Sequence, residues 1–415
     1  MNDSNQTLII FEQVDSWFFR ESRPHGSVGA NALSSVFPPP TRSLMGCLRS
    51  HIGNQYFQKN TNKSWDNLST LTELKSVIGD ATTLGCLKPR GVFVKTHIEN
   101  IERYYLPAPI SVCRKNHDTQ ESRTIYFSLQ LTDKSYQTDL GMTRLVELPL
   151  NVNGNSDLKG AKPLEDVWLS KEAWELVLQG KLDKISQVTA AAQEQDDFIS
   201  EEYRLGIQVD PNNRSVVDGQ LYQTTHIRLD PNTSFVMPVT MDKQVISTVV
   251  DDSFFNTQHL VRLGGEARMA SMSFEQSVSK FLPTPPNTLT VKRDNNKKVF
   301  MIYLLTKLMM QTDSWLPKRF TLSETGWSGS INGIDLTIMS ACIGKAHREG
   351  GWDQMHHIPR PIQSYLPAGS AFFIEVDDSI DDRTLISRLH GQSLNENDEW
   401  GEGIMLVGQL ISHDK

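Results

Sequence analysis

SSVFPPPTRSLMGCLRSHIG, residues 34–53, is the stretch that decides how the chain begins to fold. Proline lacks an amide donor and pushes the preceding residue into extended conformations, so the three prolines at 38–40 exclude a helix before residue 41. Thr41 is the expected N-cap and Gly53 the expected stop. Between them one apolar stripe recurs at helical spacing and predicts a helix: Leu44, Met45, Leu48 and Ile52.

The polar side of this predicted helix is basic. Arg42 lies in the first turn, beside backbone amides that have no partner within the helix, and Arg49 follows seven residues later on the same side. Amides and cations together suit a phosphate group. The alternative is a surface helix whose arginines are simply solvated.

The charge of the chain is uneven along its 415 residues. It holds 41 basic and 49 acidic residues, a formal net charge of −8, which argues against a free-standing nucleic-acid binder. Residues 375–402 alone hold nine acidic and two basic residues, an excess that a solvated loop would also explain. The remainder is close to neutral, so local basic spots could bind phosphate, especially in one subunit of a larger assembly.

Cysteine usage and hydropathy indicate the compartment. The four cysteines have no paired spacing and predict neither a zinc site nor a disulfide framework: Cys47, Cys86, Cys113 and Cys342. The N-terminal residues have no basic start, and no apolar run approaches the length of a bilayer span. We therefore expect a cytoplasmic protein with no membrane association, no metal and no cofactor.

Further elements follow from hydrophobic patterning. TLIIFE at 7–12 predicts a buried strand, and the aromatic residues 17–19 beside Arg20 could either stack on bases or pack in the core. A helix is expected at about 169–180, and residues 299–310, apolar on nearly every side, are expected to form a buried helix. Strands are expected around 333–343 and for AFFIEV and IMLVG in the C-terminal region.

Two turns in the middle of the chain could face a ligand. Residues 204–230 read as strand, turn and strand, with Arg214 just after the turn, and predict a long hairpin that either projects as a thumb or is an ordinary sheet hairpin. Gly264 and Gly265 end a strand near Arg268, which would let backbone approach a ligand closely or simply make a tight turn.

The C-terminal region holds the remaining candidates for chemistry. Glycines 401 and 403 precede a strand, so they match neither a phosphate loop nor a dinucleotide fingerprint. Three histidines, at 347, 356 and 357, lie near Lys345 and Arg348 and could support acid and base catalysis on RNA, bind a metal, or be ordinary loop residues.

Several blocks together resemble a known family. They are DSWFFRESRP at 15–24, FPPPTRSLMGCLRS at 37–50, RLGIQVD and DGQLY within 204–222, LGGEARMA at 263–270, GKAHREGGWD to FFIE within 344–375, and GEGIMLVG at 401–408. In this order they are similar to the third-numbered Cmr proteins, the RAMP-superfamily subunits of type III-B CRISPR complexes that hold the 5′ end of the guide RNA.

The resemblance implies an α+β fold with two tandem ferredoxin-like (RRM-like) domains, at about 1–250 and 251–415, with large insertions and a projecting hairpin. It implies a structural subunit without nuclease activity that grips the 5′ handle of the crRNA. Its partners would be the large polymerase-like Cmr subunit, the neighbouring RAMP backbone subunits and, through the complex, target RNA. Candidate RNA-binding residues are Arg20, Thr41, Arg42, Ser43, Arg49, Arg214, Gly264, Gly265, Arg268, Lys345, His347, Arg348, Gly401 and Gly403.

One feature departs from the family pattern, and other functions stay open. Acidic Asp398, Glu399 and Glu402 surround the C-terminal glycines, where a phosphate contact favours neutral or basic neighbours. A metal-independent CRISPR repeat endoribonuclease on a similar fold, with His347 or His25 as the acid-base residue, is the enzymatic alternative. A protein adaptor whose basic loop contacts only acidic partners is the third.

Overall fold

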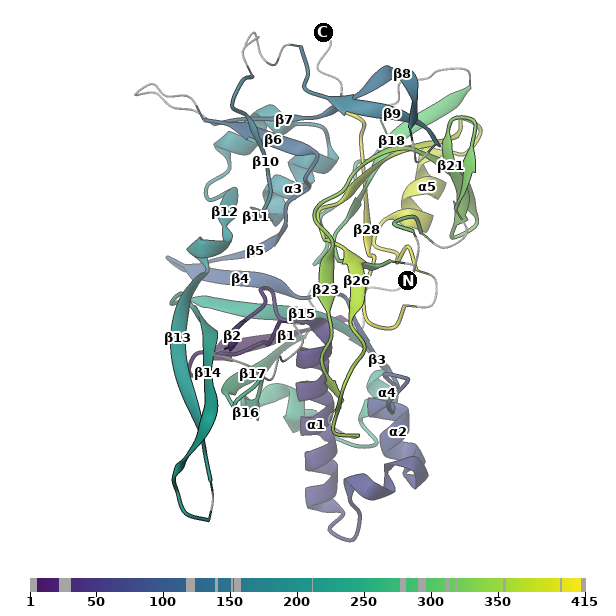
Figure 1. Ribbon diagram of the computed structural model, residues 1–415. Coiled ribbons are helices and arrows are strands. Elements are labelled where there is room, and N and C mark those ends of the chain that lie inside the picture. Colours follow the sequence, from purple (N-terminus) through teal and green to yellow (C-terminus); the bar gives the residue numbers. More distant parts are fainter. Residues whose placement is uncertain are drawn as a thin grey trace.

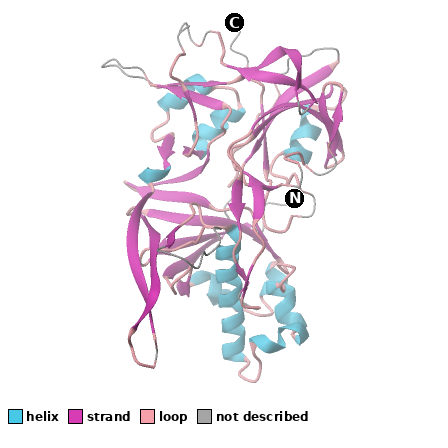
Figure 2. Cartoon of the chain, in the orientation of Figure 1, coloured by secondary structure: helices cyan, strands magenta, loops and turns pink. Residues whose placement is uncertain are grey.

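The strand predicted at 7–12 is β1 (Gln6–Gln13), which lies near the centre of the first sheet (Figure 1). The computed structural model describes residues 6–21, 31–116, 124–138, 141–150, 152, 158–210, 212–276, 281–289, 296–310, 314–317, 320–353, 356–395 and 398–411. Within them the protein is a mixed α+β structure, rich in sheet and with few helices (Figure 2).

The first sheet is built from strands that lie throughout residues 6–276. Its described strand pairs are antiparallel. Its order is β12 (Ala192–Glu194), β11 (Val167–Ser170), β5 (Ile101–Pro107), β4 (Phe93–Ile98), β15 (Thr233–Met241), β1, β17 (Met269–Gln276) and β16 (His259–Arg262), with β3 (Leu87–Pro89) also on β15.

β1 is buried on both faces, which explains its unbroken apolar run. Ile9 and Phe11 pack into a core with helix α1 (Thr41–Lys59). Leu8 and Ile10 pack on the opposite side, in a core that includes helix α3 (Lys171–Leu178) and strands of the second sheet. The two sheets are therefore joined by a shared apolar core.

Helix α1 starts where the prolines allow, but its ends differ from the prediction. The predicted stripe Leu44, Met45, Leu48 and Ile52 is fully buried. Pro40, in extended conformation, takes the N-cap position, and its carbonyl accepts a hydrogen bond from the amide of Ser43 (2.9 Å), so Thr41 is the first helical residue and not the cap. Gly53 is not the stop, because a C-cap glycine needs a left-handed φ, and the helix continues to Lys59.

The second sheet lies beyond the shared core and is covered on its other face by helix α5 (Asp382–Leu389). Its order is β20 (Thr321–Ser323), β21 (Gly326–Ile331), β22 (Ile334–Cys342), β27 (Ala371–Asp377), β18 (Lys297–Leu304) and β28 (Met405–Gly408). The strands predicted at 333–343, for AFFIEV and for IMLVG are β22, β27 and β28. The helix predicted at 299–310 is wrong: this segment begins as the central strand β18, and a strand buried on both faces has the same apolar pattern as a buried helix.

The remaining elements are smaller. They are β6 (Val112–Lys115), β7 (Ile125–Ser128) and β10 (Lys162–Pro163) in one sheet; the ribbon β8 (Gln130–Thr138) and β9 (Gly141–Glu147); helices α2 (Thr72–Ile78) and α4 (Lys243–Ile246); and 3₁₀ turns η2 (Trp65–Thr70), η3 (Leu182–Gln187), η4 (Gln195–Asp197) and η5 (Asp252–Asn256).

Two hairpins extend from this body. The predicted one is β13 (Ile199–Val209) and β14 (Val216–Leu229), with β2 (Asn31–Ser34) parallel to β14, and it projects from the first sheet (Figure 1). The second, residues 345–366, is here called the arm. It contains β23 (His347–Glu349), β24 (Trp352–Asp353), β25 (Ile358–Pro359) and β26 (Gln363–Leu366), and β19 (Leu308–Met309) pairs with its base.

Candidate nucleic-acid interface

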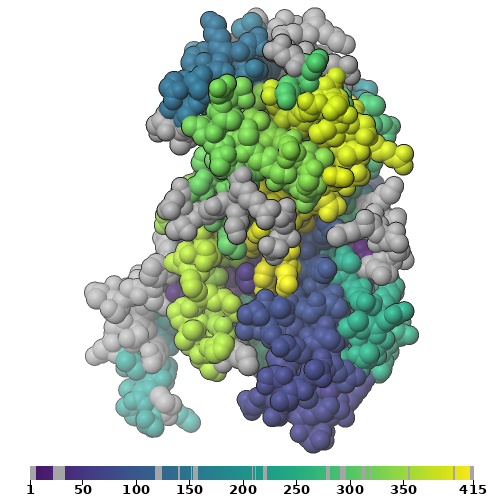
Figure 3. Space-filling view, turned by 90° about the vertical axis from the view of Figure 1, so that its right-hand side faces the viewer, coloured from purple at the N-terminus to yellow at the C-terminus, as the bar shows by residue number. Residues whose placement is uncertain are grey.

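The arm lies alongside helix α1, so the C-terminal basic residues and the N-terminal helix form one face (Figures 1 and 3). Lys345 and Arg348 are exposed on the arm. Arg360, near its tip, lies close enough to Arg49 of α1 for its charge to help lower the pKa of Arg49. The structure therefore brings together two regions that are far apart in the sequence and that were both predicted to contact RNA.

The arm is fixed to the body by a buried ion pair. Lys307, just after β18, bonds Glu349 of β23, which is 6% exposed. His347 lies 3.7 Å from the same carboxylate. Burial acts to raise the pKa of Glu349, but the His347 hydrogen bond and the Lys307 charge together outweigh it and lower this pKa. His347 is thus held by a carboxylate of its own strand, while Lys345 is exposed at the base of the arm.

The tip of the arm adds an aromatic ring to these cations. Trp352 is 55% exposed and pairs with Pro359 across the short β24–β25 ribbon. Asp353 bonds both Arg360 (3.3 Å) and His356 (3.2 Å), which ties β24 to the residue that follows β25. An exposed indole beside guanidinium groups offers the stacking surface and the charge that single-stranded nucleic acid needs.

At the other end of this face, Arg42 meets the loop at residues 398–403, called here the glycine loop. The Arg42 guanidinium lies over the Trp400 ring, with its central carbon 3.9 Å from the ring centroid. Thr41 is buried in the first turn of α1 beside it. The predicted helix N-terminus and the predicted glycine loop are thus brought together, and their contact is with each other.

The acidic residues of the glycine loop bond the backbone of the chain itself. Asp398 accepts hydrogen bonds from the amides of Trp400 (3.0 Å) and Glu402 (2.5 Å), and Glu399 accepts one from the amide of Leu84 (3.2 Å). Gly401 has a φ of +70°, and a Cβ there would lie 2.4 Å from the carbonyl oxygen of Pro89. Gly401 and Gly403 are buried. Internal contacts fill the space around both glycines, and their predicted contact with RNA stays a prediction.

Glu402 is the least expected member of this loop. It is 2% exposed, and its Oε2 has no hydrogen-bond partner among the described residues. Burial raises the pKa of Glu402 to about 7, against the lowering effects of the Lys307 and Arg42 charges. The carboxyl group is therefore poised between its neutral and charged forms near neutral pH.

Arg49 has a structural role. Its guanidinium donates to the carbonyl oxygens of Ile78 and Asp80, both at 2.5 Å, and so binds the C-terminal end of α2. Burial lowers the pKa of Arg49, and the Asp80 charge opposes this. These carbonyls hold part of its donors, and the predicted phosphate contact by Arg49 stays a prediction.

Gly264, Gly265 and Arg268 belong to the base of the projecting hairpin. The Gly265 amide donates to the carbonyl of Phe18 (2.7 Å), and a Cβ at Gly264 would lie 2.8 Å from that oxygen. Arg268 bonds Asp15 (2.7 Å) and Glu266 (3.2 Å). The close backbone approach seen here is to the chain itself, and the predicted ligand contact stays a prediction.

The remaining predicted residues are spread out. Arg214 is exposed at the tip of the β13–β14 hairpin, and Arg20 is exposed where it forms a bridge with Ser35. The aromatic residues 17–19 are buried, as the core interpretation predicted, and do not offer faces to bases. His25 lies outside the described residues.

Sequence reasoning missed Trp352, Trp400 and Lys307. Trp400 directly precedes Gly401 and could have been noticed as an aromatic side chain within the glycine loop. Lys307 lies at the end of a segment read as a helix, so its partner could not be sought. No group of three or more His, Cys, Asp or Glu side chains that could hold a metal was found in the part of the chain that the structure describes.

Comparison with known proteins gives the class and then the family. The fold is that of a sheet-rich α+β protein with a basic arm against its first long helix. The family model described as CRISPR-associated protein (Cas_Cmr3) matches residues 9–410. The chain belongs to this family, which confirms the resemblance found in the sequence.

Solved structures of CRISPR effector complexes contain similar chains. One is from the type III-B Cmr-beta complex bound to cognate target RNA, at 14% identity and a TM-score of 0.42, covering 89% of this chain and 86% of that one. Another is from a Csm3–Csm4 subcomplex of the type III-A interference complex, at 15% identity and a TM-score of 0.36, covering 91% and 94%. No curated protein sequence matches. No described helix is long and apolar enough to cross a membrane.

Proposed function

We propose that this protein is a non-catalytic, RNA-binding structural subunit of a type III-B Cmr ribonucleoprotein effector complex, and that it grips the 5′ handle of the crRNA. The observation that carries the proposal is the arm of a Cas_Cmr3 family member, which presents Lys345, Arg348 and Trp352 beside helix α1. Cations of this kind fix phosphates, and the exposed indole stacks on an unpaired base.

The RNA would lie along the arm, with Arg42 at one end of its path. Arg42 and Ser43 remain in the proposed site, since both are only partly buried in the first turn of α1. Arg20, Arg214 and His347 remain candidates for peripheral contacts. The buried Thr41, the internally bonded Arg49 and Arg268, and the four glycines support the site from within the chain.

The proposed organisation is two tandem ferredoxin-like domains. We place their boundary after Gln276, and not at residue 250, because β17 (Met269–Gln276) pairs with β1 in the first sheet. Because the two sheets share an apolar core, we expect the two domains to act together as a single support for the arm.

The proposed protein partners are the large polymerase-like subunit and the neighbouring RAMP backbone subunits, with target RNA reached through the complex. The β13–β14 hairpin supports such contacts. One face of this hairpin exposes apolar side chains in alternating positions, which favours protein contact over phosphate contact: Tyr203, Leu205, Ile207 and Val209, with Val216 on the paired strand.

The test is the affinity of the purified chain for a 5′-handle RNA against a scrambled RNA of equal length, over a salt series, with the RNA examined afterwards on a gel. We expect handle preference, intact RNA, and weaker binding with a salt slope reduced by about 1 for Lys345→Ala. Lys59→Ala is the matched control, since Lys59 is an exposed lysine paired with Asp251 at the far end of α1. Equal affinity for both RNAs, unchanged by Lys345→Ala, would contradict the proposal. Cleaved RNA would support the endoribonuclease instead.

A further inference from the structure

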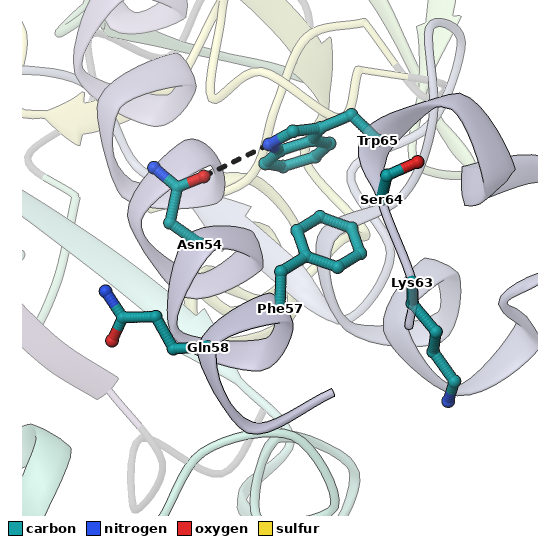
Figure 4. Close-up of a pocket in the computed structure, with 6 residues that line it drawn as sticks. All are labelled: Asn54, Phe57, Gln58, Lys63, Ser64 and Trp65. Atoms are coloured by element: carbon teal, nitrogen blue, oxygen red, sulfur yellow. Dashed lines mark hydrogen bonds between the residues drawn. The ribbon is translucent and has the colours of Figure 1, made fainter. Parts of the chain in front are cut away.

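The far end of helix α1 carries a hollow of about 470 Å³ that the handle-binding proposal does not use. It lies between α1 and the start of η2, and six side chains line it: Asn54, Phe57, Gln58, Lys63, Ser64 and Trp65 (Figure 4). It is a shallow hollow, widely open to solvent. The lining holds one cation and, among the described residues, no carboxylate.

The central element of the hollow is the fixed indole of Trp65. Its Nε1 donates to Oδ1 of Asn54 (3.1 Å), and its ring meets Phe57 edge to face, with centroids 5.1 Å apart. The ring also lies against Gly53, where a Cβ would come within 2.2 Å of it. Trp65 nevertheless remains 38% exposed. Gly53 thus seats the indole against the helix while leaving part of it open to a ligand.

Asn54 is the polar side chain that reaches this ring, and Gln58 and Lys63 lie farther from it, at opposite sides of the hollow (Figure 4). Because Asn54 uses its carbonyl oxygen for the indole, its amide nitrogen is directed away from Trp65 (Figure 4). Gln58, one helical turn later, adds a second exposed amide. Asn and Gln amides pair with the edges of nucleobases, and a tryptophan ring stacks on their faces. Lys63, on the other segment of the hollow, bonds the Tyr56 hydroxyl (2.5 Å) and supplies the cation that a phosphate needs.

The hollow also continues the face described above. Gly53 lies three turns after Arg42 on the same side of α1, about 17 Å along the axis. Arg49, one turn before Gly53, is the residue whose pKa responds to Arg360 at the tip of the arm. An RNA strand that leaves the arm at its tip would therefore reach Trp65 without crossing the body of the protein.

We propose that this hollow is a second binding site, which takes one unpaired nucleobase by stacking it on Trp65 and pairing its edge with Asn54, while Gln58 contacts the neighbouring part of the RNA. The inference rests on the proposed RNA-binding function and adds a base-specific contact at the distal end of α1. A proline-rich peptide, which also docks on aromatic rings, is the competing ligand.

The test uses the full chain and a single-stranded RNA oligonucleotide that carries 4-thiouridine. Irradiation is expected to crosslink the RNA to the peptide that contains Trp65. Trp65→Leu, which keeps an apolar side chain against Phe57, is expected to weaken RNA binding at least about fivefold, the loss of one stacked base. Gln58→Ala should weaken RNA binding less than Trp65→Leu does. Gln55→Ala should not change the affinity, because Gln55 lies three residues earlier on α1 and outside the hollow. AMP and UMP are also titrated alone: binding of either would show that the hollow takes a free nucleotide, and no binding would show that it takes a base only within RNA.

The outcomes separate this inference from the function on which it rests. Absence of the crosslink, together with an unchanged affinity for Trp65→Leu while Lys345→Ala still weakens binding, would overturn the pocket and leave the handle-binding proposal standing. If neither Trp65→Leu nor Lys345→Ala weakens RNA binding, both the pocket and the handle-binding proposal are overturned. Binding of a polyproline peptide that is abolished by Trp65→Leu, with RNA binding intact, would assign the hollow to a protein ligand. If Trp65→Leu lowers the melting temperature, the crosslink to the unaltered chain decides.

Discussion

The guanidinium of Arg42 stacks on the indole of Trp400, at 3.9 Å from the ring centroid. This contact joins the first turn of α1, which covers the first sheet, to the loop that precedes the last strand of the second sheet. It places the cation of the predicted helix N-terminus against an aromatic ring, near enough to Asp398 and Glu402 for its charge to oppose the burial that raises their pKa values.

Removal of either partner should cost stability through the same contact. Arg42→Gln and Trp400→Leu are each expected to lower the free energy of unfolding, and a double-mutant cycle should give a coupling of about 0.5–2 kcal/mol. Denaturant unfolding of the four proteins measures it. Strictly additive effects would show that the stacked geometry contributes nothing to the junction of the sheets.

Glu402 makes the stability of the protein depend on pH. Burial raises the pKa of its carboxyl group from 4.5 to about 7, so the folded protein holds this proton more tightly than the unfolded chain does. Between about pH 4.5 and 7 the folded state therefore binds more protons, and this group lowers the free energy of unfolding as the pH rises. Glu402→Gln removes the effect. Relative to the unaltered protein, it should gain stability with rising pH, by up to about 3 kcal/mol above pH 7.

The comparison is made between two proteins because a second group acts in the opposite direction. His390 is buried, and burial lowers its pKa to about 4, so its contribution to stability grows as the pH rises from 4 to 6.5. This term is common to both proteins and cancels in the difference between their unfolding curves. A difference that stays constant from pH 5 to 8 would mean that Glu402 is already charged in the folded state.

The Lys307 and Glu349 pair should hold the arm in place. Glu349→Gln leaves the mostly buried ammonium of Lys307 without its charged partner, and we expect a loss of about 3–5 kcal/mol in the free energy of unfolding, with faster tryptic cleavage after Arg348. Lys307→Met combined with Glu349→Gln should lose less, since no charge is left unpaired. Lys297→Met breaks an exposed pair with Asp377 and serves as the control, at under about 1 kcal/mol. Equal losses in all three proteins would contradict this role.

The sequence predicted what depends on local pattern. The proline run placed the start of α1, and the short, nearly unbroken apolar runs of β1 and β27 reflected their burial. β18 shows the limit of that reasoning, because a strand buried on both faces has no polar side to reveal its period.

The contacts that define the candidate site could not be predicted from the sequence, for a different reason. Arg42 with Trp400, Lys307 with Glu349, and Arg49 with the end of α2 each join segments that are distant in the sequence, and nothing in their spacing specifies the partner. Gly264 was predicted to let the backbone approach a ligand closely, and Gly401 to contact RNA. The approaching group in both cases is another part of the chain, at Phe18 and Pro89.

Arg49 separates a structural from an RNA-binding role most directly. Its two carbonyl contacts at the end of α2 are charge-assisted hydrogen bonds, so Arg49→Ala should lower the free energy of unfolding by about 1.5–3 kcal/mol. Arg49→Lys keeps the charge but cannot reach both carbonyls with one planar group, and it should recover only part of that loss. Handle-RNA affinity, measured below the unfolding temperature of each variant, should remain within about twofold, because these donors are turned inward. A loss of RNA affinity in Arg49→Ala that Arg49→Lys restores without restoring stability would return Arg49 to the RNA interface.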